Sequence, residues 1–196
     1  LYAERGDMET AQKWALKSVP IFDSSKIISA LIDDGDDLLS DVAFCTYWFL
    51  EELFYMAARI DNDGSIKLGN AYKQRCFEVV AKIFETVYQN DDMGFEQLQH
   101  LYNLHQEIAG READGGKNED IVRCHLERAM ECCEKSVSVK NHTLMHPMLY
   151  GWTVGDALSD NMMNLKLMKK TLAEKIYDDV RSCEWFQKLE MKTAAL

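Results

Sequence analysis

The sequence has almost no proline: Pro20 and Pro147 are the two prolines among 196 residues. Apolar residues make up 47% of the chain, and charged residues make up 28%. A chain with so little proline and so many apolar residues is neither disordered nor fibrous, and its composition is typical of a globular helical protein. Its length allows one domain with a core of its own.

Long apolar runs are also missing. The most apolar stretch, residues 42–50, ends at Glu51 and Glu52. It is far shorter than the roughly 20 residues that a helix needs to cross a bilayer. We therefore expect no membrane association.

Basic residues are in deficit, because 22 Lys and Arg face 33 Asp and Glu and give a net charge of −11. Proteins that bind nucleic acid concentrate Lys and Arg on one surface. The nearest such group here is small and consists of Lys166, Lys169 and Lys170. We expect this chain by itself to repel DNA and anionic membranes.

The six cysteines lack the spacing of a disulfide framework. Cys132 and Cys133 are adjacent, and all six cysteines fall within apolar helical patterns rather than in loops. A chain of this length does not need disulfides to hold its core together. We expect free buried thiols and, because thiols stay reduced there, a cytoplasmic location.

Metal-binding patterns are incomplete. No C-x-x-C pair accompanies His142 and His146, so the four converging ligands of a zinc site are not in view. The turn 61–66 resembles the middle of a calcium-binding EF-hand loop. Arg59 and Asn70, however, stand where that loop needs its first carboxylate and its bidentate Glu. We expect no bound metal.

Catalytic signatures are absent as well. The segment Gly151–Gly155 lacks the Lys-Ser/Thr of a phosphate-binding loop, and no Ser or Cys lies in a nucleophile elbow. Glu51 and Glu52 are adjacent carboxylates, but a general acid also needs a cleft and a partner. We therefore expect neither enzymatic activity nor a cofactor.

Apolar periodicity predicts an all-α fold, and no segment has a convincing strand pattern. The expected helices span 7–19, a short stretch after Ser24, 38–60, 65–88, 94–113, 118–137, 161–172, and one or two short helices within 177–189. Long helices joined by short turns pack antiparallel. We expect one helical-repeat domain over residues 1–196. Residues 1–37 should contain the end of a partial repeat and a short helix, and residues 38–137 should form two long helical hairpins. Residues 138–196 should form capping helices that carry Trp185 and Phe186.

Two of these helices carry apolar stripes. The stripe on 38–60 is Val42, Thr46, Phe49, Leu53, Met56 and Ile60, and the stripe on 65–88 is Tyr72, Cys76, Val79, Ile83 and Val87. Helix 38–60 is also apolar on its other faces, so neighbouring helices or a second subunit must cover it on more than one side.

The first twenty residues resemble the second half of a tetratricopeptide repeat, a two-helix unit of about 34 residues. Gly6 takes the turn position, Ala11 and Ser18 take the close-packing positions of the second helix, and Tyr2 takes the aromatic position of the first. A looser match places Gly110, Leu126 and Ala129 at packing positions of a later unit, where Val122 replaces the expected Ala. The chain is therefore expected to begin inside a repeat unit.

The order of segments along the chain resembles one family. "YAERGDMETAQKWALKSVP", an acidic glycine turn, two very long helices, "FEQLQHLYNLHQEIAGREA" and "HLERAMECCEKS" follow one another. This order is similar to the C-terminal helical-repeat region of Xre-type helix-turn-helix transcriptional regulators from Gram-positive bacteria. The end, "HPMLYGWTVGDALSDNMMNLKLMKKTL" through "YDDVRSCEWFQKLE", is similar to the closing helices of that family.

The resemblance implies a tetratricopeptide-like right-handed superhelix with short C-terminal capping helices. It implies a regulatory region that dimerises, with the DNA-binding domain and the first repeats upstream, so that DNA is contacted only through that absent domain. An effector, such as a peptide or small molecule, would bias helix packing and the spacing of two DNA-binding domains.

Aromatic and polar residues on two predicted helices form a possible groove for a partner or effector. They are Tyr47, Trp48, Tyr55, Tyr102 and His105. Grooves between helices bind peptides and amphipathic helices, although aromatic stripes at helical spacing also serve as core packing.

Two other functions remain open from the sequence. A free-standing adaptor would use the same groove for a protein partner and would have no DNA role. A metal-dependent or hydrolytic helical enzyme would contain bound metal.

Overall fold

A computed structural model describes residues 35–62, 69–88, 92–116, 118–146, 149–155 and 162–194. The helix expected over 7–19, the short helix after Ser24 and the repeat-like segment from Tyr2 to Ser18 lie outside the described residues. Six α-helices are described: α3 (Gly35–Asn62), α4 (Asn70–Val87), α5 (Phe95–Arg111), α6 (Glu119–Ser138), α7 (Met163–Leu172) and α8 (Glu184–Ala194). The expectation of a mostly helical chain is confirmed.

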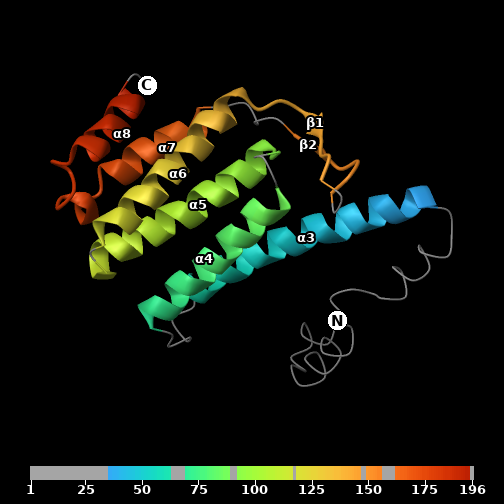
Figure 1. The fold of residues 1–196 in the computed structure, drawn as a ribbon, viewed down its shortest axis with the longest axis horizontal. Coiled ribbons are helices and arrows are strands. Elements are labelled where there is room, and N and C mark those ends of the chain that lie inside the picture. The colour runs from blue at the N-terminus through green and yellow to red at the C-terminus, as the bar shows by residue number, and fades with distance from the viewer. Residues whose placement is uncertain are drawn as a thin grey trace, which may run out of the picture.

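Successive helices lie side by side and run in opposite directions (Figure 1). Each of α3 to α7 contacts the helix that follows it, and α5 and α6 share the broadest contact. The predicted helix bounds of 94–113 and 118–137 agree with α5 and α6 to within two residues at each end. Among the described helices, none combines the length and apolarity that a bilayer-spanning segment needs.

The connection between α5 and α6 shows how the sequence sets a helix start. A π-helical turn, Glu112–Gly116, follows α5. Asn118 caps α6, because its Oδ1 accepts hydrogen bonds from the backbone N–H groups of Asp120 at 3.1 Å and Ile121 at 3.3 Å. Glu112 Oε1 accepts a further bond from the backbone N–H of Asn118 at 3.1 Å. A Cβ at Gly116 would displace the Glu112 carboxylate, and with it the hydrogen bond that Glu112 accepts from Asn118.

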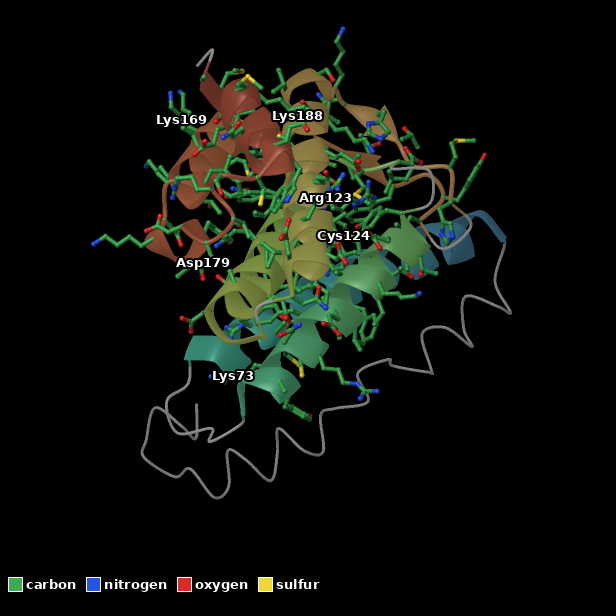
Figure 2. The ribbon with its side chains drawn as sticks, turned by 60° about the vertical axis from the view of Figure 1, so that its left-hand side comes forward. Lys73, Arg123, Cys124, Lys169, Asp179 and Lys188 are labelled. Carbon is green, nitrogen blue, oxygen red and sulfur yellow. The ribbon has the colours of Figure 1, made fainter. Side chains whose placement is uncertain are left out.

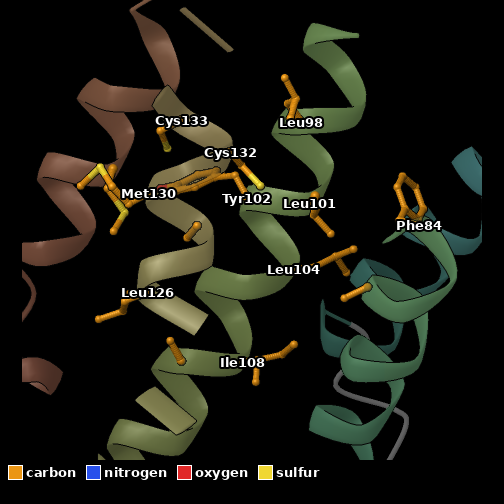
Figure 3. Packing of buried hydrophobic residues seen from close by; sticks show 14 of the residues in the cluster. Phe84, Leu98, Leu101, Tyr102, Leu104, Ile108, Leu126, Met130, Cys132 and Cys133 are labelled. Atoms are coloured by element: carbon orange, nitrogen blue, oxygen red, sulfur yellow. The ribbon is translucent and has the colours of Figure 1, made fainter. Parts of the chain in front are cut away.

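The core lies between α4, α5 and α6 (Figure 3). Phe84 enters it from α4, Leu101 and Leu104 from α5, and Leu126 and Met130 from α6; all five are fully buried or nearly so. Burying a large apolar side chain stabilises a fold by about 1.5–3 kcal/mol relative to exposure. This layer therefore holds the three long helices together.

The predicted apolar stripe of α4 is only partly on the buried face. Tyr72 and Val79 are 57% and 52% exposed, whereas Phe77, Val80 and Phe84 are buried. The helix carries two apolar stripes about one residue apart, and the stripe with the two phenylalanines packs into the core. Of the predicted stripe, Ile83 and Val87 are partly buried against that core.

The predicted stripe of α3 is displaced in the same way. Thr46 is buried as predicted, but Met56 is exposed. Ala43, Leu50 and Ala57 lie at the buried positions instead.

A two-stranded hairpin after α6 was not predicted. Strand β1 (His142–Thr143) pairs antiparallel with β2 (Thr153–Val154), with His142 opposite Val154. The backbone N–H of Phe95 donates to the carbonyl of Gly155 at 3.3 Å, which ties the hairpin to the start of α5. A Cβ at Gly94 would come within 2.6 Å of Val154 Cβ, so glycine is needed for this close approach.

The C-terminal segments pack onto the end of the helical stack. A 3₁₀ turn, Lys175–Tyr177, links α7 to α8, and α8 contacts both α6 and α7. Tyr177 and Phe186 are fully buried with ring centroids 6.0 Å apart, and Trp185 Nε1 donates to Glu119 Oε1 at 2.9 Å. Exposed charged side chains such as Lys169 and Lys188 project outward from α7 and α8 (Figure 2).

Candidate functional site

The groove predicted from the sequence does not include its two α5 residues. Tyr102 is buried, and its hydroxyl lies 3.0 Å from Thr171 Oγ1. His105 is also buried, with Nδ1 2.8 Å from Nδ1 of His125. Helix α5 is packed between α4 and α6, so these two side chains belong to the core.

The three α3 residues of the predicted groove lie at the surface or near it. Trp48 is 51% exposed and Tyr55 is also exposed. Tyr47 is partly buried, with its ring centroid 5.0 Å from that of Trp152 and 6.0 Å from that of Trp48. The structure thus separates the predicted set into core residues on α5 and surface aromatics on α3.

A polar cluster joins α3 and α5 beside these aromatics. Glu51 Oε2 lies 2.7 Å from His100 Nε2, and the Tyr47 hydroxyl donates to Glu96 Oε2 at 2.9 Å. Both pairs are separated by 49 residues in sequence. A constant offset means that α3 and α5 run parallel at this point, as expected of alternate helices in an antiparallel stack. Because the two pairs have the same offset along the helices, all four side chains lie next to one another.

Two members of the cluster are deeply buried. Glu51 is 4% exposed and His100 is buried, whereas Glu96 reaches the surface. Phe54 stacks on the His100 ring, with centroids 4.0 Å apart and planes 21° apart. The stacking holds the imidazole with Nε2 directed at Glu51. A buried carboxylate costs free energy unless its oxygens are paired.

That pairing is incomplete. Glu51 Oε1 has no hydrogen-bond partner, and neither does the hydroxyl of Tyr88, which is 1% exposed. Burial, and then the negative charge of Glu51, raise the pKa of Tyr88 far above its ordinary value of 10. The Phe84 ring lies 5.8 Å from the Tyr88 ring and 6.2 Å from the His100 ring, measured between centroids. Most buried polar groups in proteins are satisfied, so the unpaired oxygen of the buried Glu51 calls for an explanation.

The cluster opens onto a hollow with a volume of about 360 Å³. Tyr47 and Glu96 line it from the helices, and Trp152, Thr153 and Gly155 line it from the hairpin. Burial and the hydrogen bond to Glu96 raise the pKa of Tyr47 well above its ordinary value, so its hydroxyl stays a donor at neutral pH. A small molecule in the hollow would contact Glu96 directly.

The ligand geometry of this cluster is that of a possible metal site. One ligand atom from each of Glu51, Glu96 and His100 lies within 4.8 Å of the other two. Among the described residues, no other group of three or more His, Cys, Asp and Glu side chains brings its ligand atoms this close together. Two carboxylates and one imidazole suit a divalent transition-metal ion.

The sequence contained a signal for this cluster that the motif analysis missed. Tyr47 and Glu51 are spaced i,i+4 on α3, and Glu96 and His100 are spaced i,i+4 on α5, so each pair shares a helix face. Glu51 was considered only with Glu52, which is exposed. The pairing of the two helices could not be read from one chain.

The cysteines and the two histidines of the tail do not form a site together. The described cysteines are free thiols, as expected, but only Cys132 and Cys133 are buried as predicted; Cys124 is exposed, and Cys76 and Cys183 are partly exposed. Burial raises the pKa of Cys133 far above its ordinary value, which keeps that thiol protonated and unreactive. His142 pairs with Asp92 at 2.9 Å from Nε2 to Oδ1.

A second titratable cluster lies between α4, α5 and α6. Glu85 Oε1 lies 3.4 Å from His105 Nε2 and accepts from Arg128 Nε at 3.1 Å. His105, and then Arg128, lower the pKa of Glu85 to about 2. Burial, and then the charge of His105, lower the pKa of His125 to about 4. In this cluster the His105 side chain is 6% exposed, whereas those of Arg128 and Glu85 are 25% and 37% exposed.

The second cluster predicts acid sensitivity. Because His125 has a folded pKa of about 4 against an ordinary 6.5, the unfolded chain binds its proton first on acidification. Stability should therefore fall between about pH 6.5 and 4 from His125, and further from 4.5 towards 2 as Glu85 is protonated. The free energy of unfolding in urea should be measured at several pH values between 7 and 4. Its decrease over this range should be much smaller in His125→Gln than in the wild type, and should be retained in His146→Gln. A decrease in His125→Gln as large as that in the wild type would contradict this assignment.

A comparison of the chain with protein-family models, curated proteins and solved structures finds no match. The resemblance to helical-repeat regulators therefore rests on the order of the sequence segments, and function has to be argued from the geometry.

Proposed function

We propose that this chain is the regulatory, protein-interaction and dimerisation region of a DNA-binding transcriptional regulator. Its helices would continue a tetratricopeptide-like right-handed superhelix, and a peptide or small effector would set its conformation. The alternation of long antiparallel helices supports this proposal, because stacked helical hairpins present extended surfaces to partners.

The observation that carries the proposal is a partly exposed apolar surface on α3 and α4, which we call the outer face. It surrounds a hollow of about 390 Å³. Met56, Tyr72 and Val79 are exposed there. The other residues that line the hollow are the partly buried Leu53 and Cys76, the buried Ala57 and Val80, and the exposed Arg75. Exposed apolar side chains scattered singly need no explanation, but a contiguous group marks an interaction site. In the proposed dimer, the outer face of a second copy of the chain packs against the outer face of the first, and both faces are buried.

The charge of the chain fits a regulator in which a separate domain binds DNA. The chain has a net charge of −11, and an acidic surface does not attract a phosphate backbone. DNA would be read by a separate basic domain, and the spacing of two such domains would depend on how two outer faces pack.

The hollow beside Tyr47 and Trp152 is where an effector would act. It lies between α3 and the hairpin, and α3 also carries part of the outer face. A ligand that favours one position of α3 would shift the population of dimer geometries by its differential affinity for them.

Val79→Glu tests the role of the outer face. Val79 is exposed, so the substitution should change folding stability by no more than about 0.5 kcal/mol. Buried at a dimer interface, the same carboxylate would be unpaired and would dissociate the dimer. Light scattering on a sizing column should give a monomer mass for Val79→Glu. Met191→Glu, at a 65% exposed position on α8, should leave the dimer intact. Equal masses for Val79→Glu and the wild type would contradict the proposal.

The alternative function is an adaptor that binds a different protein and has no DNA role. The exposed aromatics Trp48 and Tyr55 favour it, because they add contact surface on α3 beyond the outer face. The intact mass of the native product separates the two functions. A mass of 22.6 kDa would favour the adaptor, and a larger product with a DNA-binding domain would favour the regulator.

A further inference from the structure

We propose that Glu51, Glu96 and His100 bind a divalent first-row transition-metal ion, such as Zn²⁺, that links α3 to α5. The ligand atoms come from two helices and already lie within 4.8 Å of one another. At metal–ligand bonds of about 2.1 Å, the ligands of a tetrahedral site are roughly 3.4 Å apart. The 2.7 Å between Glu51 Oε2 and His100 Nε2 would have to widen as a metal ion takes the place of their hydrogen bond, and Glu96 would have to approach.

The unsatisfied oxygen of Glu51 points independently to a ligand. Glu51 is 4% exposed, and its Oε1 has no hydrogen-bond partner. A metal ion bound to this carboxylate would satisfy it, which explains why a carboxylate with one unpaired oxygen lies buried beside His100.

The chemistry of the three side chains selects the class of ion. Imidazole nitrogen disfavours Mg²⁺ and Ca²⁺, which prefer ligand sets made entirely of oxygen. The absence of sulfur from the set disfavours Cu⁺. One nitrogen and two carboxylates fit Zn²⁺, Mn²⁺ or Fe²⁺, and three protein ligands leave a position for water on the side of Glu96.

Binding would replace the proton held between Glu51 Oε2 and His100 Nε2. If the His100 imidazole is neutral, the proton leaves Nε2 and a proton is taken up at Nδ1. If it is an imidazolium, the Nε2 proton is released to solvent and the proton on Nδ1 stays. Tyr47 would orient Glu96 through its 2.9 Å hydrogen bond, as groups behind a metal ligand commonly do.

Equilibrium dialysis against Zn²⁺, followed by elemental analysis, tests the site on the whole chain. The wild type and Glu52→Gln should each bind one equivalent. Glu51→Gln and His100→Gln should lose it, and Tyr47→Phe should bind about 10-fold more weakly, a loss typical of removing a supporting hydrogen bond. Glu52 is the matched control, because it is an exposed neighbour of Glu51.

Glu96→Gln keeps the test decisive if the buried variants fail to fold. Glu96 is exposed, so its replacement should leave the helical circular dichroism unchanged and still abolish stoichiometric binding. Absence of stoichiometric Zn²⁺ from the folded wild type would overturn the proposal. So would Zn²⁺ affinity in Glu96→Gln equal to that in Glu52→Gln, or a thiolate charge-transfer band when Co²⁺ is bound, since the proposed site contains no sulfur.

Discussion

Replacing Phe84 with alanine should lower the free energy of unfolding by about 3–5 kcal/mol, the usual cost of truncating a fully buried aromatic side chain. Phe84 is completely buried between α4 and α5. Its ring centroid lies 5.8 Å from that of Tyr88 and 6.2 Å from that of His100. The substitution would leave a cavity in the layer that supports the polar cluster.

Trp48→Ala is the matched control for Phe84→Ala. Trp48 is a larger aromatic, but about half of its surface is exposed on α3, so its truncation should cost about 1 kcal/mol. Urea unfolding followed by circular dichroism measures both changes. If Trp48→Ala costs as much as Phe84→Ala, Trp48 is a core residue and does not serve a binding surface.

Replacing Glu51 with alanine should lower the free energy of unfolding by about 3 kcal/mol. The change leaves His100 buried without its partner. An unsatisfied buried polar group costs about 1–3 kcal/mol, and breaking a buried ion pair costs about 3–5 kcal/mol. The Glu51–His100 pair is buried on both sides, so the expected loss lies where these two ranges meet.

Glu52→Ala should change the stability by no more than about 0.5 kcal/mol, because Glu52 is exposed. Both variants should be unfolded in urea in the presence of a chelator, so that metal binding does not contribute to the difference. A loss in Glu51→Ala no larger than that in Glu52→Ala would show that the buried pair contributes little to holding α3 on α5. That result would not decide whether Glu51, Glu96 and His100 bind Zn²⁺, because the unfolding is measured with a chelator present.

Helix positions could be predicted from the sequence more reliably than helix faces. The bounds of α5 and α6 followed from apolar periodicity, and the structure adds that Asn118 caps the start of α6. On α4, however, Val79 and Val80 belong to adjacent stripes of similar apolarity, and only packing against α5 decides which stripe is buried. The hairpin at 142–154 was missed because two-residue strands have no alternating pattern to detect.

The polar cluster illustrates the limit of reasoning from one chain. Each helix carries its pair at i,i+4 spacing, but Glu51 and His100 meet only because α3 and α5 run parallel in one register. That register depends on how α4 packs against both. For the same reason the sequence left open whether Tyr102 and His105 line a groove or pack in the core, since it does not say which helix lies inside the stack; both side chains are buried.

Sedimentation equilibrium of the wild-type chain over a wide concentration range tests the central claim most directly. If the outer face of α3 and α4 joins two copies, the mass should rise with concentration to about twice 22.6 kDa. A mass that stays at 22.6 kDa up to the highest concentration would contradict dimerisation through this region, and the regulator proposal would give way to the adaptor.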